Sequence, residues 1–193
     1  MAEFRKILIA NRGEIAIRVM RAANEMGKST VAVFAKEDKL SLHRFKADEA
    51  YEIGKALGPV ASYLNIKEII SVAIKAGADA IHPGYGLLSE KPEFAKACNK
   101  AGISFIGPTA EIMEKLGNKA NARKIAEKAG VPVIPASDIL PDNPKDLIKI
   151  AKKLGFPLML KASWGGGGRG MRLINNIEAV SYTHLTLPTT LSV

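Results

Sequence analysis

The sequence predicts an α/β protein built on a doubly wound parallel sheet with helices on both faces. Its first apolar run, Lys6–Ala10, is short and ends at a polar turn, Asn11–Gly13, as a buried strand does. A helical pattern follows from Glu14 and stops at Gly27, and the next apolar run is Thr30–Phe34. A strand, a helix and a second strand in this order form the opening unit of an open parallel sheet.

The next elements alternate in the same way as far as residue 106. Lys36–Asp48 is a charged region, and Gly54, Gly58 and Pro59 mark a loop. Asn65 is placed to cap a helix whose isoleucines make one face. The expected elements are strands at Ala50–Ile53, Ala78–Ile81 and Ile103–Ile106 and helices at Ile66–Ala76 and Pro92–Ala101.

A domain boundary is expected at Gly107–Thr109, because the spacing of elements changes there. We assign residues 1–109 to a first domain, 110–180 to the beginning of a second, and 181–193 to a tail. Asn118 is placed to cap one of the helices that follow. The second domain is expected to contain helices at 110–116, 118–129 and 144–154 and strands at 132–134, 157–160 and 171–174.

Composition excludes several classes of protein. The chain has 193 residues, of which 47% are hydrophobic and 24% charged, as in globular proteins, and no apolar run approaches the roughly 18–20 residues that span a bilayer. The net charge of +9 is spread along the chain and aromatic residues are few, so a nucleic-acid partner is only a minor alternative. One cysteine, Cys98, and no signal-peptide pattern favour the cytoplasm; Cys98 follows Phe94 by one helical turn, which favours a core residue over a reactive thiol.

The stretch Lys161–Arg172 has the strongest chemical signal. Two apolar runs, Pro157–Leu160 and Met171–Ile174, enclose four consecutive glycines between Lys161 and Arg169. Glycine lets successive backbone amides turn toward one point, and amides flanked by cations suit a polyphosphate. The pattern predicts a strand, a nucleotide-phosphate lid and a second strand; the alternative is a flexible linker.

Three other stretches combine glycine and polar residues at the ends of strands, and each has a structural alternative. Asn11–Glu14 is either functional or simply a turn with an acidic residue at a helix N-terminus. In His82–Glu90 the histidine is either functional or a hydrogen-bonded core residue. Lys119 with Arg123, one turn further on, is either a ligand contact or a solvated helix face.

Five motifs follow one another along the chain: Arg12–Ala16, His82–Glu90, Phe105–Pro108, Gly117–Lys119 and Lys161–Arg172. Taken together, these motifs resemble the beginning of biotin carboxylase, a member of the ATP-grasp biotin-dependent carboxylases. The likeness covers residues 4 to about 180. Two further stretches, Glu37–Glu49 and Ala162–Gly165, look most like the pyruvate carboxylase branch of that family.

The resemblance implies a Rossmann-like pre-ATP-grasp domain, followed by the truncated start of an ATP-grasp domain. In this family ATP phosphorylates bicarbonate, and the resulting carboxyl group passes to biotin and, in the pyruvate carboxylase branch, to pyruvate, which gives oxaloacetate. Lys119 and Lys161 match lysines that touch the ATP phosphates, and Met171 lines the adenine side. Tyr85 and Gly86 match the biotin and bicarbonate side, and the lid consists of Gly165, Gly166, Gly167 and Gly168.

The resemblance also implies the cofactors and partners of the full-length enzyme. These are ATP, Mg²⁺, biotin, bicarbonate, a biotinyl domain and further copies in a homo-oligomer, with no nucleic acid and no membrane. Two alternatives stay open. The first is the biotin carboxylase subunit of an acetyl-CoA or propionyl-CoA carboxylase, and the second is a non-catalytic assembly or binding module.

The tail, residues 181–193, has no Lys, Arg, Asp or Glu, and contains four threonines and three leucines. This abrupt change favours a cloning or sequence-assembly scar over an edge strand.

We predict that the 193-residue chain neither hydrolyses ATP nor carboxylates biotin. The resemblance places the catalytic residues, the metal ligands among them, downstream of residue 180. The check is an ATP turnover assay on the purified chain, in which bicarbonate-dependent ADP release above background would contradict this expectation.

Overall fold

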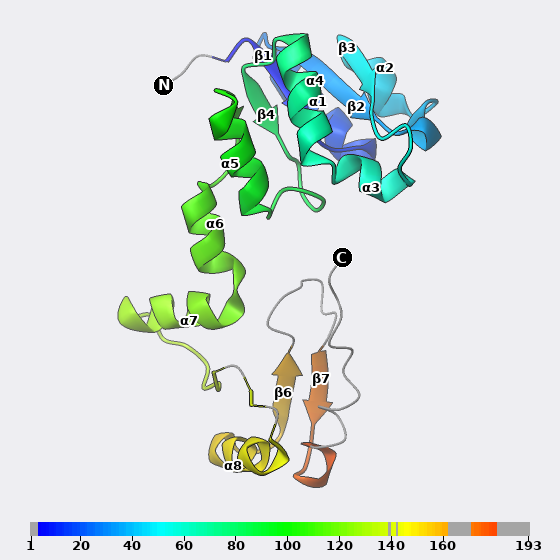
Figure 1. Ribbon diagram of the computed structural model, residues 1–193. Helices are drawn as coiled ribbons and strands as arrows, with labels where there is room; N and C mark the ends of the chain where they lie inside the picture. The colour runs from blue at the N-terminus through cyan, green and yellow to red at the C-terminus, as the bar shows by residue number, and fades with distance from the viewer. Residues whose placement is uncertain (1–3, 139, 142, 162–170, 181–193) are drawn as a thin grey trace. The chain divides into compact units, whose positions relative to one another are not determined.

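A five-stranded parallel sheet forms the centre of the N-terminal part of the chain (Figure 1). The computed structural model describes residues 4–138, 140–141, 143–161 and 171–180. Contacts divide the chain into two units, residues 1–114 and 115–193. The strand order of the sheet is β3-β2-β1-β4-β5, and each neighbouring pair is parallel. The predicted doubly wound α/β fold is therefore confirmed.

The first unit alternates strands and helices. Its strands are β1 (Lys6–Ile9), β2 (Ser29–Phe34), β3 (Glu49–Glu52), β4 (Ala80–His82) and β5 (Ser104–Phe105). Its helices are α1 (Gly13–Glu25), η1 (a 3₁₀ helix, Lys36–Asp38), α2 (Leu42–Lys46), α3 (Pro59–Tyr63), α4 (Ile66–Ala76) and α5 (Pro92–Lys100), and α6 (Ala110–Gly117) follows.

The sheet is covered on both faces, as expected for central strands, β1, β2 and β4, that are apolar on both sides. Leu8 of β1 belongs to the largest core cluster, together with Ile69 of α4 and Phe94 of α5. The next residue, Ile9, points to the other face and packs with Met20 of α1. Cys98 is fully buried in the larger cluster, and burial raises the pKa of its thiol to about 11, so its prediction as a core residue is confirmed.

The helix signals of the sequence act as expected at two caps. The Asn65 side chain accepts a hydrogen bond from the Glu68 backbone N–H, and Gly77 ends α4 with a left-handed backbone. In the second unit, α7 (Lys119–Lys128) begins after Asn118, whose Oδ1 accepts bonds from the backbone N–H groups of Ala120 and Asn121. Each cap satisfies amides that have no partner within the helix.

One local prediction is wrong, and some short helices were not predicted. Residues 132–134, expected as a strand, form no strand with the described residues, and Pro132 and Pro135 lack the N–H groups that a ladder needs. The loop expected at Gly54 and Gly58 is present, and α3 begins directly after it at Pro59; the charged region 36–48, to which no element was assigned, contains η1 and α2. These helices are five residues long or shorter, too short for a period to appear in the sequence.

The second unit contains a hairpin and a helix. The hairpin consists of β6 (Leu158–Lys161) and β7 (Met171–Ile174), and α8 (Pro144–Leu154) packs against one of its faces. The small core joins Leu147 and Ala151 of α8 to Leu160 and Ile174 of the hairpin. The glycine turn, within 162–170, and the tail, 181–193, lie outside the described residues.

No helix among the described residues is long and apolar enough to cross a membrane.

His43 of α2 is a buried titratable group. Its side chain is fully buried, and its Nε2 lies 3.2 Å from the Val33 carbonyl oxygen, to which it donates. Burial lowers the pKa of His43, and the Arg12 guanidinium acts in the same direction, whereas the Val33 carbonyl and the Asp38 carboxylate oppose it. Its Nδ1 has no hydrogen-bond partner among the described residues, so folding favours the neutral ring.

We expect the folded chain to lose stability as the pH falls through the ordinary histidine pKa of 6.5. Below that pH the unfolded chain binds a proton at His43 that the folded chain does not bind, so unfolding is favoured. Urea unfolding followed by circular dichroism between pH 7.5 and 5.5 measures the effect. His43→Gln keeps an N–H donor but does not titrate, so its stability should depend less on pH; an unchanged pH dependence in this variant would contradict the assignment.

Candidate functional site

The Asn11 side chain links the ends of β1 and β4, the two strands between which the strand order reverses. Asn11 follows β1, and its Nδ2 donates to the backbone oxygens of Pro83, at 2.7 Å, and Tyr85, at 3.0 Å. Its Oδ1 accepts from the Arg12 backbone N–H at 2.9 Å. The residue is 5% exposed. In open parallel sheets ligands bind where the strand order reverses, outside the carboxyl ends of the strands.

The turn after β4 has a backbone that depends on glycine. Gly84 and Gly86 have φ angles of 66° and 67°, in the left-handed region. A Cβ on Gly84 would lie 2.6 Å from Asn11 Nδ2, so a larger residue there would displace the Asn11 amide. Leu87, which follows, also has a positive φ, 45°. This turn presents the Tyr85 side chain, which is 64% exposed and whose hydroxyl lies 3.4 Å from a Glu14 carboxylate oxygen.

His82 supports this turn from within. Its Nδ1 accepts a hydrogen bond of 2.9 Å from the Gly84 backbone N–H, which places the proton of the neutral ring on Nε2. Burial lowers the pKa of His82. This hydrogen bond agrees with the structural alternative for His82, that of a hydrogen-bonded histidine.

A buried carboxylate, Asp38, joins three segments beside this site. Its Oδ2 accepts from the Tyr63 hydroxyl at 2.7 Å, and its Oδ1 accepts from the Ser41 hydroxyl at 3.0 Å and lies 3.3 Å from Arg12 Nη2. The Arg12 guanidinium also lies 5.6 Å from the centre of the Tyr63 ring. Burial raises the pKa of Tyr63, so the phenol stays a hydrogen-bond donor to the carboxylate. The network holds the loop after β2 against the start of α1.

The outer face of the β6–β7 hairpin is apolar and ends in a cation. Register pairs Met159 with Leu173, and Lys161 with Met171, on the face opposite the core residues Leu160 and Ile174. Met159 is 44% exposed, Met171 42% and Leu173 59%. The structure thus brings together two predicted site residues, Lys161 and Met171, at the end of the hairpin nearest the glycine stretch.

The other predicted residues are more dispersed. Lys119 is the first residue of α7, separate from the hairpin in sequence, and its side chain is exposed. Tyr85 and Gly86 lie in the first unit. Gly165, Gly166, Gly167 and Gly168 lie outside the described residues. Arg123 of α7 bonds to Glu127 at 2.6 Å and to the Ala136 carbonyl oxygen at 2.7 Å.

Sequence reasoning missed Met159 and Leu173 as members of the hairpin face. The signal was available in the two-residue period of strands: Met159 lies two residues before Lys161, and Leu173 two after Met171. It also missed the amide of Asn11, since nothing local in the sequence shows that this side chain reaches a turn more than 70 residues away.

The arrangement suits a ligand with a flat apolar part and a negatively charged part. Thioether and aliphatic side chains on the hairpin face can pack against an aromatic ring, and the Lys161 ammonium can pair with an anion. Among the residues that the structure describes, no group of three or more His, Cys, Asp or Glu side chains could hold a metal ion.

Comparisons with known proteins agree with this geometry. The family described as "Biotin carboxylase, N-terminal domain" matches residues 3–113, and "Carbamoyl-phosphate synthase L chain, ATP binding domain" matches residues 118–189. The fold is an open parallel α/β sheet, a class of protein that binds ligands at the carboxyl edge of the sheet. The chain belongs to the biotin carboxylase family, which confirms the resemblance seen in its motifs.

Three relatives illustrate the likeness. Pyruvate carboxylase 1 of Caenorhabditis elegans is 52% identical over 178 residues, 92% of this chain and 15% of that protein. The biotin carboxylase of Halalkalibacterium halodurans is 54% identical over 176 residues, 91% of this chain and 38% of that protein. The biotin carboxylase domain of Hydrogenobacter thermophilus 2-oxoglutarate carboxylase, solved with MgADP, ADP and bicarbonate, gives a TM-score of 0.91 at 44% identity, over 96% of this chain and 40% of that one. The chain thus spans a minor part of each relative.

Replacing Asn11 by Asp is expected to destabilise the first unit. The change keeps the shape of the side chain but replaces the amide group that donates to two backbone carbonyl oxygens. The free energy of unfolding should therefore fall by about 1–3 kcal/mol. Urea unfolding measures the loss, and hydrogen exchange at the amides of residues 84–87 should speed up. Asn24→Asp on the exposed side of α1 is the matched control; equal effects of the two substitutions would contradict a specific role for Asn11.

Proposed function

We propose that this chain forms the N-terminal part of an enzyme that carboxylates biotin at the expense of ATP and bicarbonate. In the full-length protein the carboxyl group then passes to pyruvate and gives oxaloacetate. In this proposal the second unit binds the nucleotide, and the turn after β4 in the first unit faces the biotin and bicarbonate.

The observation that carries the proposal is the hairpin face that ends at Lys161. A nucleotide has a planar base and a charged phosphate chain, and this face offers apolar side chains at Met159 and Met171 beside the Lys161 ammonium. An exposed apolar strand face is otherwise unfavourable in water, and a base packed against it removes that cost. Lys161 supplies a charge at the end of the face where the phosphates would lie.

The relatives support the same chemistry. The second family match is described as an ATP-binding domain, and the Hydrogenobacter thermophilus domain was solved with MgADP and bicarbonate. The Caenorhabditis elegans relative is named a pyruvate carboxylase, which supports pyruvate as acceptor. The Halalkalibacterium halodurans relative, named a biotin carboxylase, supports the alternative of a separate subunit that serves acetyl-CoA or propionyl-CoA.

Roles for the remaining residues are part of the proposal. Lys119 and Lys161 hold the phosphates, Gly165 to Gly168 close over them, and Met171 lines the adenine. Tyr85 and Gly86 face biotin. The described residues offer no ligand set for the Mg²⁺ that accompanies ATP, so we assign them no part in metal binding.

The organisation of the full-length protein is also proposed. Domains at 1–109 and 110–180 are supported by the family matches at 3–113 and 118–189; the second match extends into the tail that we interpret as a scar. A homo-oligomer is supported by the dimer of the Hydrogenobacter thermophilus domain. The biotinyl domain as partner and the cytoplasm as location are proposed from the sequence alone.

Isothermal titration calorimetry of the 193-residue chain with MgATP tests the nucleotide site. We expect measurable binding, weakened at least about tenfold by Lys161→Ala, because a hydrogen bond to a charged group contributes about 1.5–3 kcal/mol. Lys153→Ala, on the exposed side of α8, removes the same charge elsewhere in the unit and should leave the affinity unchanged.

Met159→Ser provides a second arm of this test. It removes apolar surface from the outer face without changing the charge. The affinity for MgATP should therefore fall more than the affinity for inorganic triphosphate, which has no base. No MgATP binding by the wild-type chain, or equal losses in the Lys161 and Lys153 variants, would contradict the proposed site.

A further inference from the structure

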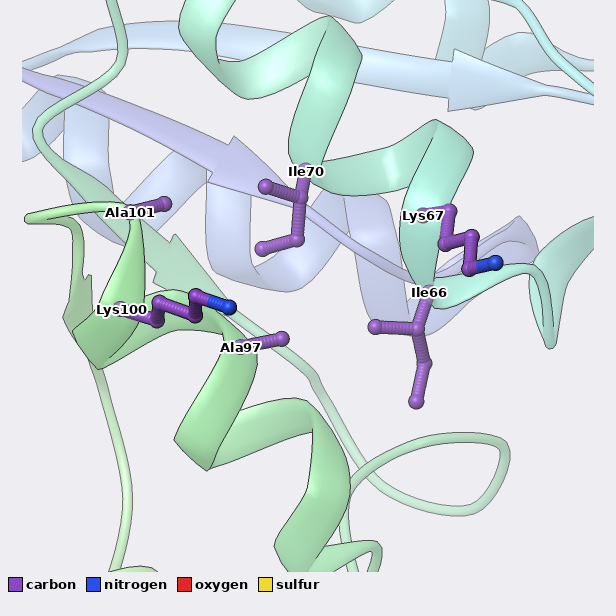
Figure 2. A pocket seen from close by; sticks show the side chains of 6 residues that line it. All are labelled: Ile66, Lys67, Ile70, Ala97, Lys100 and Ala101. Atoms are coloured by element: carbon purple, nitrogen blue, oxygen red, sulfur yellow. The ribbon is translucent and has the colours of Figure 1, made fainter.

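The groove between α4 and α5 combines an apolar floor with cations at its margins (Figure 2). Ile66 and Ile70 extend from α4, and Ala97 and Ala101 from the end of α5. These side chains are partly exposed. The groove is thus an accessible strip of aliphatic surface on the face of the first unit covered by α4 and α5.

The apolar pattern of α4 extends beyond its fully buried residues. Ile69, Val72, Ala73 and Ala76 face the core and would suffice for a surface helix. A second row of isoleucines recurs at every fourth residue; Ile66 and Ile70 pack partly against the core and remain partly exposed, and Ile74 is 61% exposed. Contiguous aliphatic surface of this kind marks contact sites in proteins.

Two lysines flank the apolar row. Figure 2 shows Lys67 extending from α4 and Lys100 from α5, on either side of the aliphatic side chains. Among the described residues neither ammonium has an ion-pair partner, whereas the next lysine on α5, Lys96, pairs with Glu114. An apolar strip between unpaired cations is complementary to an apolar strip between carboxylates.

We propose that this groove binds an acidic amphipathic helix, whose apolar stripe lies on Ile66, Ile70 and Ile74 and whose carboxylates pair with Lys67 and Lys100. Two packed helices leave a furrow that a third helix can enter with its side-chain ridge, as in helix-in-groove recognition. The residues that line the groove do not include Asn11, Tyr85 or Lys161, and the inference goes beyond the proposed carboxylation of biotin.

The test uses the full chain and two designed peptides of about 15 residues. Both repeat leucine at spacings of three and four; one has glutamate and the other lysine at the flanking positions. Fluorescence anisotropy should show the acidic peptide binding more tightly than the basic one. In Lys67→Glu/Lys100→Glu the acidic peptide should bind at least about fivefold more weakly, and the basic peptide should gain affinity.

Control variants make the outcome specific. Lys36→Glu/Lys46→Glu changes the net charge by the same amount, but its two residues lie in η1 and α2, outside the groove. This control variant should weaken the binding of the acidic peptide less than the groove variant does. Ile74→Ser should reduce the binding of the acidic peptide to the wild-type chain and of the basic peptide to the Lys67→Glu/Lys100→Glu variant. Leu40→Ser replaces a residue that is 84% exposed and should reduce neither.

Several results would overturn the proposal. One is equal binding of the acidic and basic peptides by the wild-type chain. Another is an equal loss of affinity for the acidic peptide in the groove variant and in the control charge variant. A third is concentration-dependent self-association abolished by Ile74→Ser, which would assign the groove to a second copy. Binding to phosphatidylserine vesicles without binding of the acidic peptide would assign it to a lipid surface instead.

Discussion

The hydrogen bonds of the Asn11 amide fix the place where the two halves of the parallel sheet meet. β1 pairs with β2 on one side and β4 on the other, so the chain must leave β1 at the point where the strand order reverses. Backbone groups that leave a sheet lose their ladder partners, and a buried carbonyl without a partner is costly. Asn11 supplies donors to two such carbonyls, and Gly84 is the residue that leaves room for it. The exposed position of Tyr85 depends on this arrangement.

The sheet and its order of elements could be predicted because parallel strands are buried on both faces. Runs such as Thr30–Phe34 are then apolar throughout, and the helices between them show a period of 3.6. Caps at Asn65 and Asn118 have local causes and appear directly in the sequence. The helices α2 and α3 could not be predicted, because their formation depends on tertiary contacts: His43 reaches the Val33 carbonyl and Tyr63 reaches Asp38.

The site shows the same division between local and long-range causes. The pairing of Lys161 with Met171 follows from two apolar runs around a glycine turn, a local pattern. The exposed face that adds Met159 and Leu173 follows from strand alternation, once the other face is known to pack on α8. In contrast, the Arg12–Asp38–Tyr63 network joins residues from three separate loops and helices. Each residue alone has an ordinary structural explanation, and only the fold brings them together.

The hairpin explains why an apolar surface and a charged residue occur on one strand face. A two-stranded sheet has little stability of its own, and here one face is stabilised by Leu147 and Ala151 of α8. The opposite face has no such role in the described core, so its apolar residues are free to serve a ligand. Because register places Lys161 and Met171 directly opposite each other, a single ligand that touches one can touch the other. Binding energy at this face therefore depends on strand register, and a shift of one residue would turn Met159 and Lys161 toward the core.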